Sequence, residues 1–177
     1  KEVNLQMFRW SDSLATLVIP AKLERIQNMK SLKHLQGISV DVNNDRFSAI
    51  DGVLYDKAHE TLYGCPRAYK GCLRVSEGTK RVMAGALVDC KRITRVDLPA
   101  SLEAMSFREF SRMDGLEEII FRGDAPVMTA GKGGEEVFLL QVANPEVKVV
   151  VPKDAVKAYE AELAQERGEY VELEGEA

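Results

Sequence analysis

Two histidines, His34 and His59, are the only imidazole bases in the chain of 177 residues. Nucleophilic catalysis needs such a base beside a nucleophile and an orienting group. The sequence has no Gly-x-Ser-x-Gly elbow to present a nucleophile. Paired carboxylates such as 117–118 and 135–136 are adjacent, so a strand would point their side chains to opposite faces. We therefore expect no catalytic residues and no enzyme.

A second group of residues could bind calcium. Asp41, Asn43 and Asp45 place oxygen atoms at alternate positions, as calcium loops do. That loop also requires Gly at its sixth position and Glu at its twelfth. This sequence has Arg46 and Gly52 there. An ordinary polar turn is the favoured interpretation.

The remaining chemical candidates are a glycine-rich stretch and three cysteines. Residues 131–134 lack the preceding strand and the Gly-Lys-Ser/Thr ending of a phosphate loop, so a flexible loop is expected. Cys65, Cys72 and Cys90 are too few and too widely spaced for a typical zinc site. One pair could form a disulfide, although free buried thiols are favoured. We expect neither a metal nor a cofactor.

The composition is that of a folded, moderately acidic domain. Apolar residues make up 45% and charged residues 29%, which excludes a disordered or collagen-like chain. The net charge is −4, whereas general nucleic-acid and anionic-membrane binders are usually basic. No apolar run approaches the roughly 20 residues of a membrane span. We expect neither a nucleic-acid partner nor membrane insertion of this segment.

The elements that position these residues are indicated by a repeat of about 23 residues, a length within the range of leucine-rich repeats. The same apolar pattern occurs three times, and its core reads apolar-x-x-apolar-x-apolar, which is the leucine-rich-repeat strand pattern. A shortened copy runs from Ile26 to Leu35. The three full copies consist of Val3, Phe8, Leu14, Leu17 and Ile19; Val82, Leu87, Ile93, Val96 and Leu98; and Met105, Phe110, Leu116, Ile119 and Phe121.

This pattern predicts an α/β repeat fold. Alternation at the end of each copy places apolar side chains on one face of a strand. A single copy cannot bury that face alone, so stacked copies form a continuous core and a parallel strand ladder. We expect an irregular leucine-rich-repeat solenoid with short turns or helices, an inserted β-hairpin and a C-terminal capping helix. Leu98 and Phe121 should be equivalent buried residues on adjacent strands.

The repeats resemble the BspA-like leucine-rich repeats of bacterial surface proteins. Residues 73–82 and 85–99 follow that family's spacing, with Leu87 and Phe110 at its Phe position. Residues 47–57 and 61–66 resemble its inserted hairpin, and 149–159 its closing strand and helix. The resemblance implies an exported or surface-anchored bacterial protein, its export signal removed, that binds proteins of a host or a neighbouring cell.

We interpret residues 1–177 as a single leucine-rich-repeat domain. One copy departs from the family by having Arg122 in place of Pro, and residues 129–144 are an insertion. The helix is expected over 154–166. The parts are the first repeats (1–40), the hairpin insertion (41–66), the regular repeats (72–122), a loop (123–146) and the closing strand with the cap helix (147–177).

The outer side of the strand ladder is the best candidate for function. Residues between the apolar positions should point away from the core and form a mixed charged and apolar surface. We expect it to bind a protein or peptide partner, for example in adhesion. The alternatives are a solvated sheet face in a structural spacer of a longer surface protein, or an accessory domain of an enzyme. The candidate binding residues are Arg74, Arg95, Asp97, Glu118 and Ile120.

Overall fold

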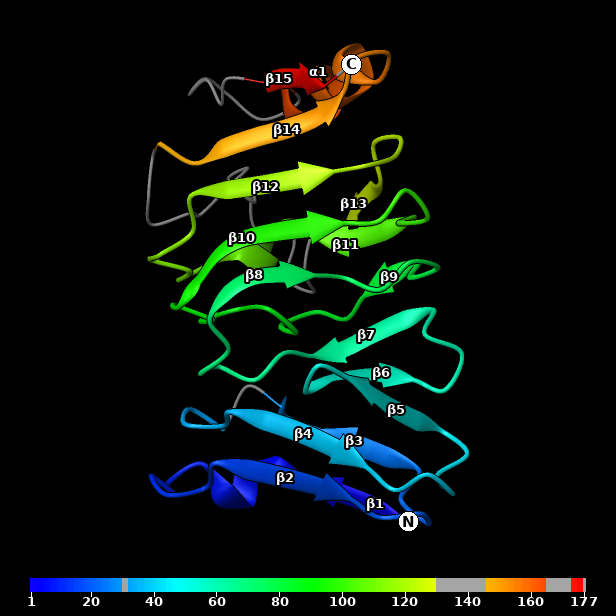
Figure 1. Cartoon of the computed structure of the whole chain (residues 1–177), viewed down its shortest axis with the longest axis vertical. Helices are drawn as coiled ribbons and strands as arrows, with labels where there is room; N and C mark the ends of the chain where they lie inside the picture. The colour runs from blue at the N-terminus through cyan, green and yellow to red at the C-terminus, as the bar shows by residue number, and fades with distance from the viewer. Residues whose placement is uncertain (30–31, 130–145, 165–172, 177) are drawn as a thin grey trace.

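The structure is a computed structural model that describes residues 1–29, 32–129, 146–164 and 173–176. Its strands stack as successive rungs from the N-terminus to the C-terminus (Figure 1). The glycine-rich stretch at 131–134 and most of the expected loop lie outside the described residues. Among the described residues, no helix combines the length and the apolar character needed to cross a bilayer.

The expected parallel ladder is present. Its strands pair in the order β15-β14-β12-β10-β8, all parallel. Val96 lies opposite Ile119 and Leu98 opposite Phe121, so the predicted register is confirmed and these side chains are buried. The strands are β8 (Gly71–Arg74), β10 (Ile93–Leu98), β12 (Glu118–Phe121), β14 (Lys148–Pro152) and β15 (Leu173–Glu176).

A second sheet returns the chain on the opposite side of the core. It contains the short parallel strands β9 (Arg81–Val82), β11 (Ala104–Ser106) and β13 (Val127–Thr129). A 3-10 helix, η3 (Phe107–Phe110), follows β11, and the Ser106 side chain caps it by accepting a hydrogen bond from the Arg108 backbone amide. Short returns of this kind allow each turn of the solenoid to close within a single copy of the repeat.

The first repeats form two small parallel sheets. β1 (Glu2–Asn4) leads into η1 (Leu5–Phe8) and pairs with β3 (Arg25–Gln27), while β2 (Thr16–Ile19) pairs with β4 (Gly37–Val40). Val3 lies opposite Ile26, as the full repeat length requires. Leu17 lies opposite Ile38, and these two residues are fewer positions apart in the sequence than Val3 and Ile26, as the shortened copy predicts.

The hairpin insertion is a three-stranded antiparallel meander. β5 (Phe47–Ile50), β6 (Val53–Asp56) and β7 (Thr61–Gly64) pair in sequence order, and β7 then joins β9 of the second sheet. The β5–β6 turn is Asp51-Gly52, both with positive φ of 50° and 79°. Two such residues form the type I′ turn whose twist matches that of a hairpin.

β6 divides the interior into two hydrophobic cores. Val53 and Tyr55 belong to the larger core, which extends through the ladder to Tyr159. Leu54, between them in sequence, belongs to the smaller core of the first repeats. Both faces of this strand are therefore buried, because successive side chains point to opposite faces.

The C-terminal helix packs as expected but begins two residues later than expected, and residues 165 and 166 lie outside the described residues. α1 (Val156–Ala164) directs Tyr159 against Phe121, with ring centroids 5.1 Å apart. The Tyr159 hydroxyl group lies 3.0 Å from the carbonyl oxygens of both Gly123 and Asp124. Strand β15 was not expected, because the C-terminal tail from residue 162 to 177 is rich in glutamate. It pairs through its backbone, which the tail's many glutamates do not prevent.

Candidate interaction surface

The register of the ladder arranges the outward residues in two rows. We call these rows, together with Arg122, the ladder face. The strand pairings place equivalent residues directly opposite one another. The first row is polar throughout, whereas the second changes from charged to apolar toward the C-terminus. The first row is Cys72, Arg95, Glu118 and Lys148, and the second is Arg74, Asp97, Ile120 and Val150.

Three of the five candidate binding residues are accessible and two are not. The Arg74 side chain is 81% exposed, and those of Arg95 and Glu118 are 43% and 24% exposed. The expectation that Asp97 and Ile120 are exposed is wrong, since each is only 2% exposed. Strand alternation determines which face a side chain occupies, but neighbours about 4.8 Å away on both sides can still cover it.

Asp97 is covered by arginines. Arg122 donates two hydrogen bonds to its carboxylate, from Nε at 2.6 Å and from Nη2 at 2.9 Å. Arg74 Nε lies 3.5 Å from the same group. The hydrogen bonds from Arg122, with further attraction from Arg74 and Arg95, hold the pKa of Asp97 below its ordinary value despite burial. Sequence reasoning missed this role of Arg122, although its replacement of the family's Pro was a signal.

Arg95 and Glu118 form a further ion pair of the ladder face. Arg95 Nε lies 3.1 Å from Glu118 Oε2 across the β10–β12 pairing. A half-exposed pair of this kind contributes little to stability, typically about 0–1 kcal/mol. Its importance is for the charge pattern of the surface.

A shallow groove of about 410 Å³ adjoins the ladder face where β12 and β14 end. Ile120 and Val150 lie on its apolar side, and Arg122, Lys153 and Asp154 supply its charges. The groove is therefore lined by both apolar and charged residues, a mixture that peptide-binding surfaces commonly have.

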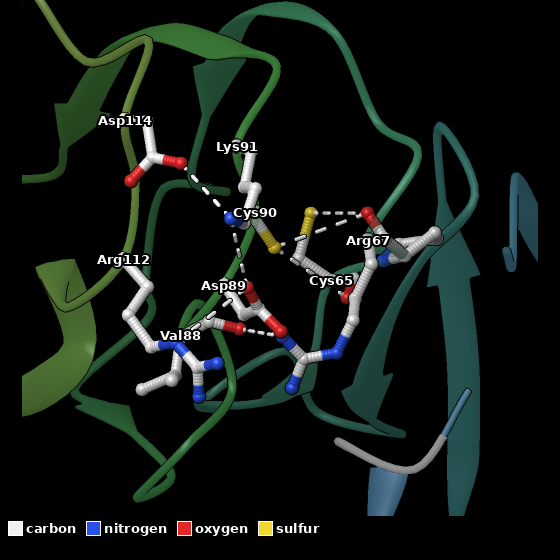
Figure 2. A network of polar contacts seen from close by, with 9 residues as sticks. Cys65, Arg67, Val88, Asp89, Cys90, Lys91, Arg112 and Asp114 are labelled. Carbon is white, nitrogen blue, oxygen red and sulfur yellow. Dashed lines mark hydrogen bonds and ion pairs between the residues drawn. The ribbon is translucent and has the colours of Figure 1, made fainter. Parts of the chain in front are cut away.

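A separate chain of ion pairs lies in the turns that precede the ladder strands (Figure 2). The Asp89 carboxylate lies 3.0 Å from Arg67 and 3.9 Å from Arg112. Lys91 Nζ lies 4.0 Å from Asp89 and 2.9 Å from Asp114, so it connects the two carboxylates. Arg67 also donates to the Val88 carbonyl. Asp89 and Arg112 are one repeat apart and share a positive φ. Opposite charges alternate along these turns, which favours a structural role over ligand binding.

The three cysteines are free thiols. Cys65 and Cys90 are buried, as expected, and both sulfur atoms approach the Pro66 carbonyl oxygen, at 3.7 and 3.9 Å. Burial, reinforced by Cys90, raises the pKa of the Cys65 thiol well above its ordinary value. Cys72 instead lies exposed on the ladder face, where burial had been expected.

The segment considered for calcium is a structural turn. Asn44 is fully buried, and its amide nitrogen donates to the carbonyls of Pro20 and Leu23 at 2.8 and 3.0 Å. Its side-chain oxygen accepts from the amides of Arg46 and Phe47, both at 2.8 Å. This confirms the polar-turn interpretation. In the described parts of the chain, no three His, Cys, Asp or Glu side chains cluster as metal ligands.

The other chemical candidates are separate from one another. His34 lies 3.7 Å from Asp12, and the His59 ring packs 5.9 Å from Tyr55. Glu109, which sequence reasoning did not consider, is a fully buried carboxylate. It accepts hydrogen bonds from the Gly85 and Leu87 amides at 2.6 and 3.1 Å. Burial raises the pKa of Glu109 to about 7.

Three solved structures resemble this arrangement. The fold is a leucine-rich-repeat solenoid. A leucine-rich repeat protein from Eubacterium ventriosum aligns over 79% of this chain and 42% of its own, with a TM-score of 0.56 and 15% identity. A leucine-rich cell-surface protein from Faecalibacterium prausnitzii aligns over 93% and 49%, with a TM-score of 0.53 and 16% identity.

The third neighbour is the pneumococcal vaccine antigen PcpA, aligned over 78% of this chain and 39% of its own, with a TM-score of 0.57 and 17% identity. The chain thus spans less than half the length of each of these proteins. No family model matches the sequence. No curated protein matches it either. The expected leucine-rich-repeat solenoid is confirmed. Two of its neighbours are described as leucine-rich proteins, one of them a cell-surface protein, and the third as a vaccine antigen.

Proposed function

We propose that the chain is a non-catalytic recognition module that binds a protein or peptide partner through its ladder face. The main support is that the charged rows on β8, β10 and β12 are not covered by a helix of the described chain, so that Arg74 and Arg95 face solvent. The fold neighbours also include a cell-surface protein and a vaccine antigen. We accordingly propose a location at the cell surface or outside the cell.

One observation favours a structural spacer as the second candidate. Both carboxylates of the ladder face already have arginine partners within the chain, Asp97 with Arg122 and Glu118 with Arg95. A surface whose charges satisfy one another can also be a solvated face with no ligand.

The test uses a variant that changes the charge pattern while keeping the ion pair. Arg95→Glu combined with Glu118→Arg reverses both charges across the same strand pairing, so the melting temperature should change little. Peptides selected on the native protein from a displayed random library should lose affinity for this variant, because local fields determine recognition.

The matched control exchanges an ion pair on the opposite side of the solenoid. Lys80 and Glu60 lie 2.7 Å apart, and Lys80→Glu with Glu60→Lys preserves that pair. It should retain peptide binding. Equal affinity of both folded variants would move the site off the ladder face, and failure to select any peptide would favour the spacer.

A further inference from the structure

The cations of the ladder face lie nearer to solvent than the carboxylates they neutralise. The Arg74, Arg95 and Arg122 side chains are 81%, 43% and 44% exposed. The carboxylates of Asp97 and Glu118 are 2% and 24% exposed. An approaching ligand therefore meets guanidinium groups first, with the negative charges beneath or beside them.

The groove beside the ladder face continues this charge pattern. Lys153 and Arg122 lie on its rim, with Asp154 as the opposing acid. Lys148 of β14 is exposed in the first row. Counted together, the ladder face and the groove hold five cations and three carboxylates, on a chain whose net charge is −4. The surface is thus locally cationic on an acidic molecule.

The apolar residues of the second row are covered, which leaves recognition mainly to the charged groups. Ile120 and Val150 form neighbouring positions of that row and line the groove, but they are only 2% and 3% exposed. Guanidinium groups bind carboxylates in a planar, two-pronged geometry. A segment laid across the ladder meets successive strands about 4.8 Å apart. Acidic side chains at every second position of an extended segment share one face, and they would reach Arg74 and Arg122 together.

We propose that the ligand of the ladder face is an extended peptide segment with an acidic residue at every second position, so that its carboxylates all face the arginines. This inference rests on the proposed function and adds the chemical class of the partner. Such a ligand is attracted by the outer guanidinium groups and competes with Asp97 for Arg74, whose contact of 3.5 Å is the longest of that carboxylate's ion pairs.

The experiment measures binding of three labelled peptides by fluorescence anisotropy. They alternate Asp with Val, Ser with Val, or Lys with Val. The Asp-Val peptide should bind most tightly, and more weakly as sodium chloride rises, because salt screens exposed charges. Arg74→Glu should weaken its binding about three- to tenfold, by removing one attraction and adding a repulsion.

Arg81→Glu is the matched control, since it makes the same change in net charge at an exposed residue of β9. It should leave Asp-Val binding within experimental error. Equal weakening by both variants would reduce the effect to net charge and overturn the proposal. Equal binding of the Ser-Val peptide, or no binding of the Asp-Val peptide, would also overturn it. The proposed function is judged separately, by the library selection and the Arg95–Glu118 exchange.

Discussion

The first turn and the later turns carry the same apolar pattern but bury it to different extents. Leu14 of the first turn is half-buried, whereas Leu116, at the equivalent position, is fully buried. The sequence of a repeat determines which side chains face inward, and neighbouring turns on both sides determine how deeply they are covered. The same contrast separates Val3, Phe8 and Leu17 from Val82, Leu87 and Val96.

The two regions also differ in their exposed apolar surface. Met7, Trp10 and Val18 are 72%, 77% and 69% exposed, and all belong to the first turn. Arg9 lies over the Trp10 ring at 4.4 Å, a contact that partly shields the indole. The regular repeats (72–122), flanked by strands on both edges, show less of this, with Met83 at 41% as their most exposed large apolar side chain.

The largest expected effect is the loss of a side chain from the fully buried position. Leu116→Ala should lower the free energy of unfolding by about 2–5 kcal/mol, because it leaves a cavity in the larger core. Leu14→Ala, the same substitution at the equivalent half-buried position, should cost only about 1 kcal/mol. Urea titrations of both variants measure this difference. Equal costs would show that the two turns are packed alike.

The next effect is the pH dependence conferred by Glu109 in the larger core. Its pKa is raised from 4.5 to about 7, so between these values the folded chain holds a proton that the unfolded chain has lost. Its contribution to stability is therefore present below about pH 4.5 and is lost as pH rises through about 7. The change is on the order of 3 kcal/mol. Glu109→Gln should flatten this part of a stability–pH curve, and an unchanged slope would contradict the assignment.

A smaller effect is expected where the first repeats are held by hydrogen bonds. Asn44→Ala removes four contacts to backbone groups and leaves buried donors and acceptors without partners. We expect a loss of about 1–3 kcal/mol. Asn43→Ala, at an exposed position two residues from Asp41, should remain within about 0.5 kcal/mol of the native protein. Thermal melts of the two variants test whether the buried amide stabilises this turn.

The repeat and its register could be predicted because periodicity specifies which residues become neighbours. Val96 and Ile119 occupy the same position in successive copies of the repeat and pair in the structure. The shortened copy from Ile26 to Leu35 was likewise visible in its spacing. The division into two cores was not, since β6 reads as an apolar run whose sequence does not show that Leu54 faces a different interior from Val53.

The sequence predicted which residues lie on the candidate surface, but not how deeply each of them is buried. The pattern placed Asp97 and Ile120 on the outward face of the ladder, but their burial depends on neighbours brought together by folding. Arg122, 25 residues from Asp97, provides its bidentate partner. Glu109 escaped notice because a lone glutamate beside aromatic residues has no pattern that distinguishes burial from exposure.

The division of the interior by β6 has a consequence for cooperativity. In most solenoids each turn contacts only its neighbours, so unfolding can begin at one end and spread inward turn by turn. Here one strand contributes Leu54 to one core and Tyr55 to the other, while the Tyr55 hydroxyl group lies 3.3 Å from the Ser76 amide. Loss of either core would strip one face of β6 and weaken its pairing with both β5 and β7. The strand thus links the two cores, and we expect fraying that begins at the N-terminal end to stop at β6 more readily than at other turns.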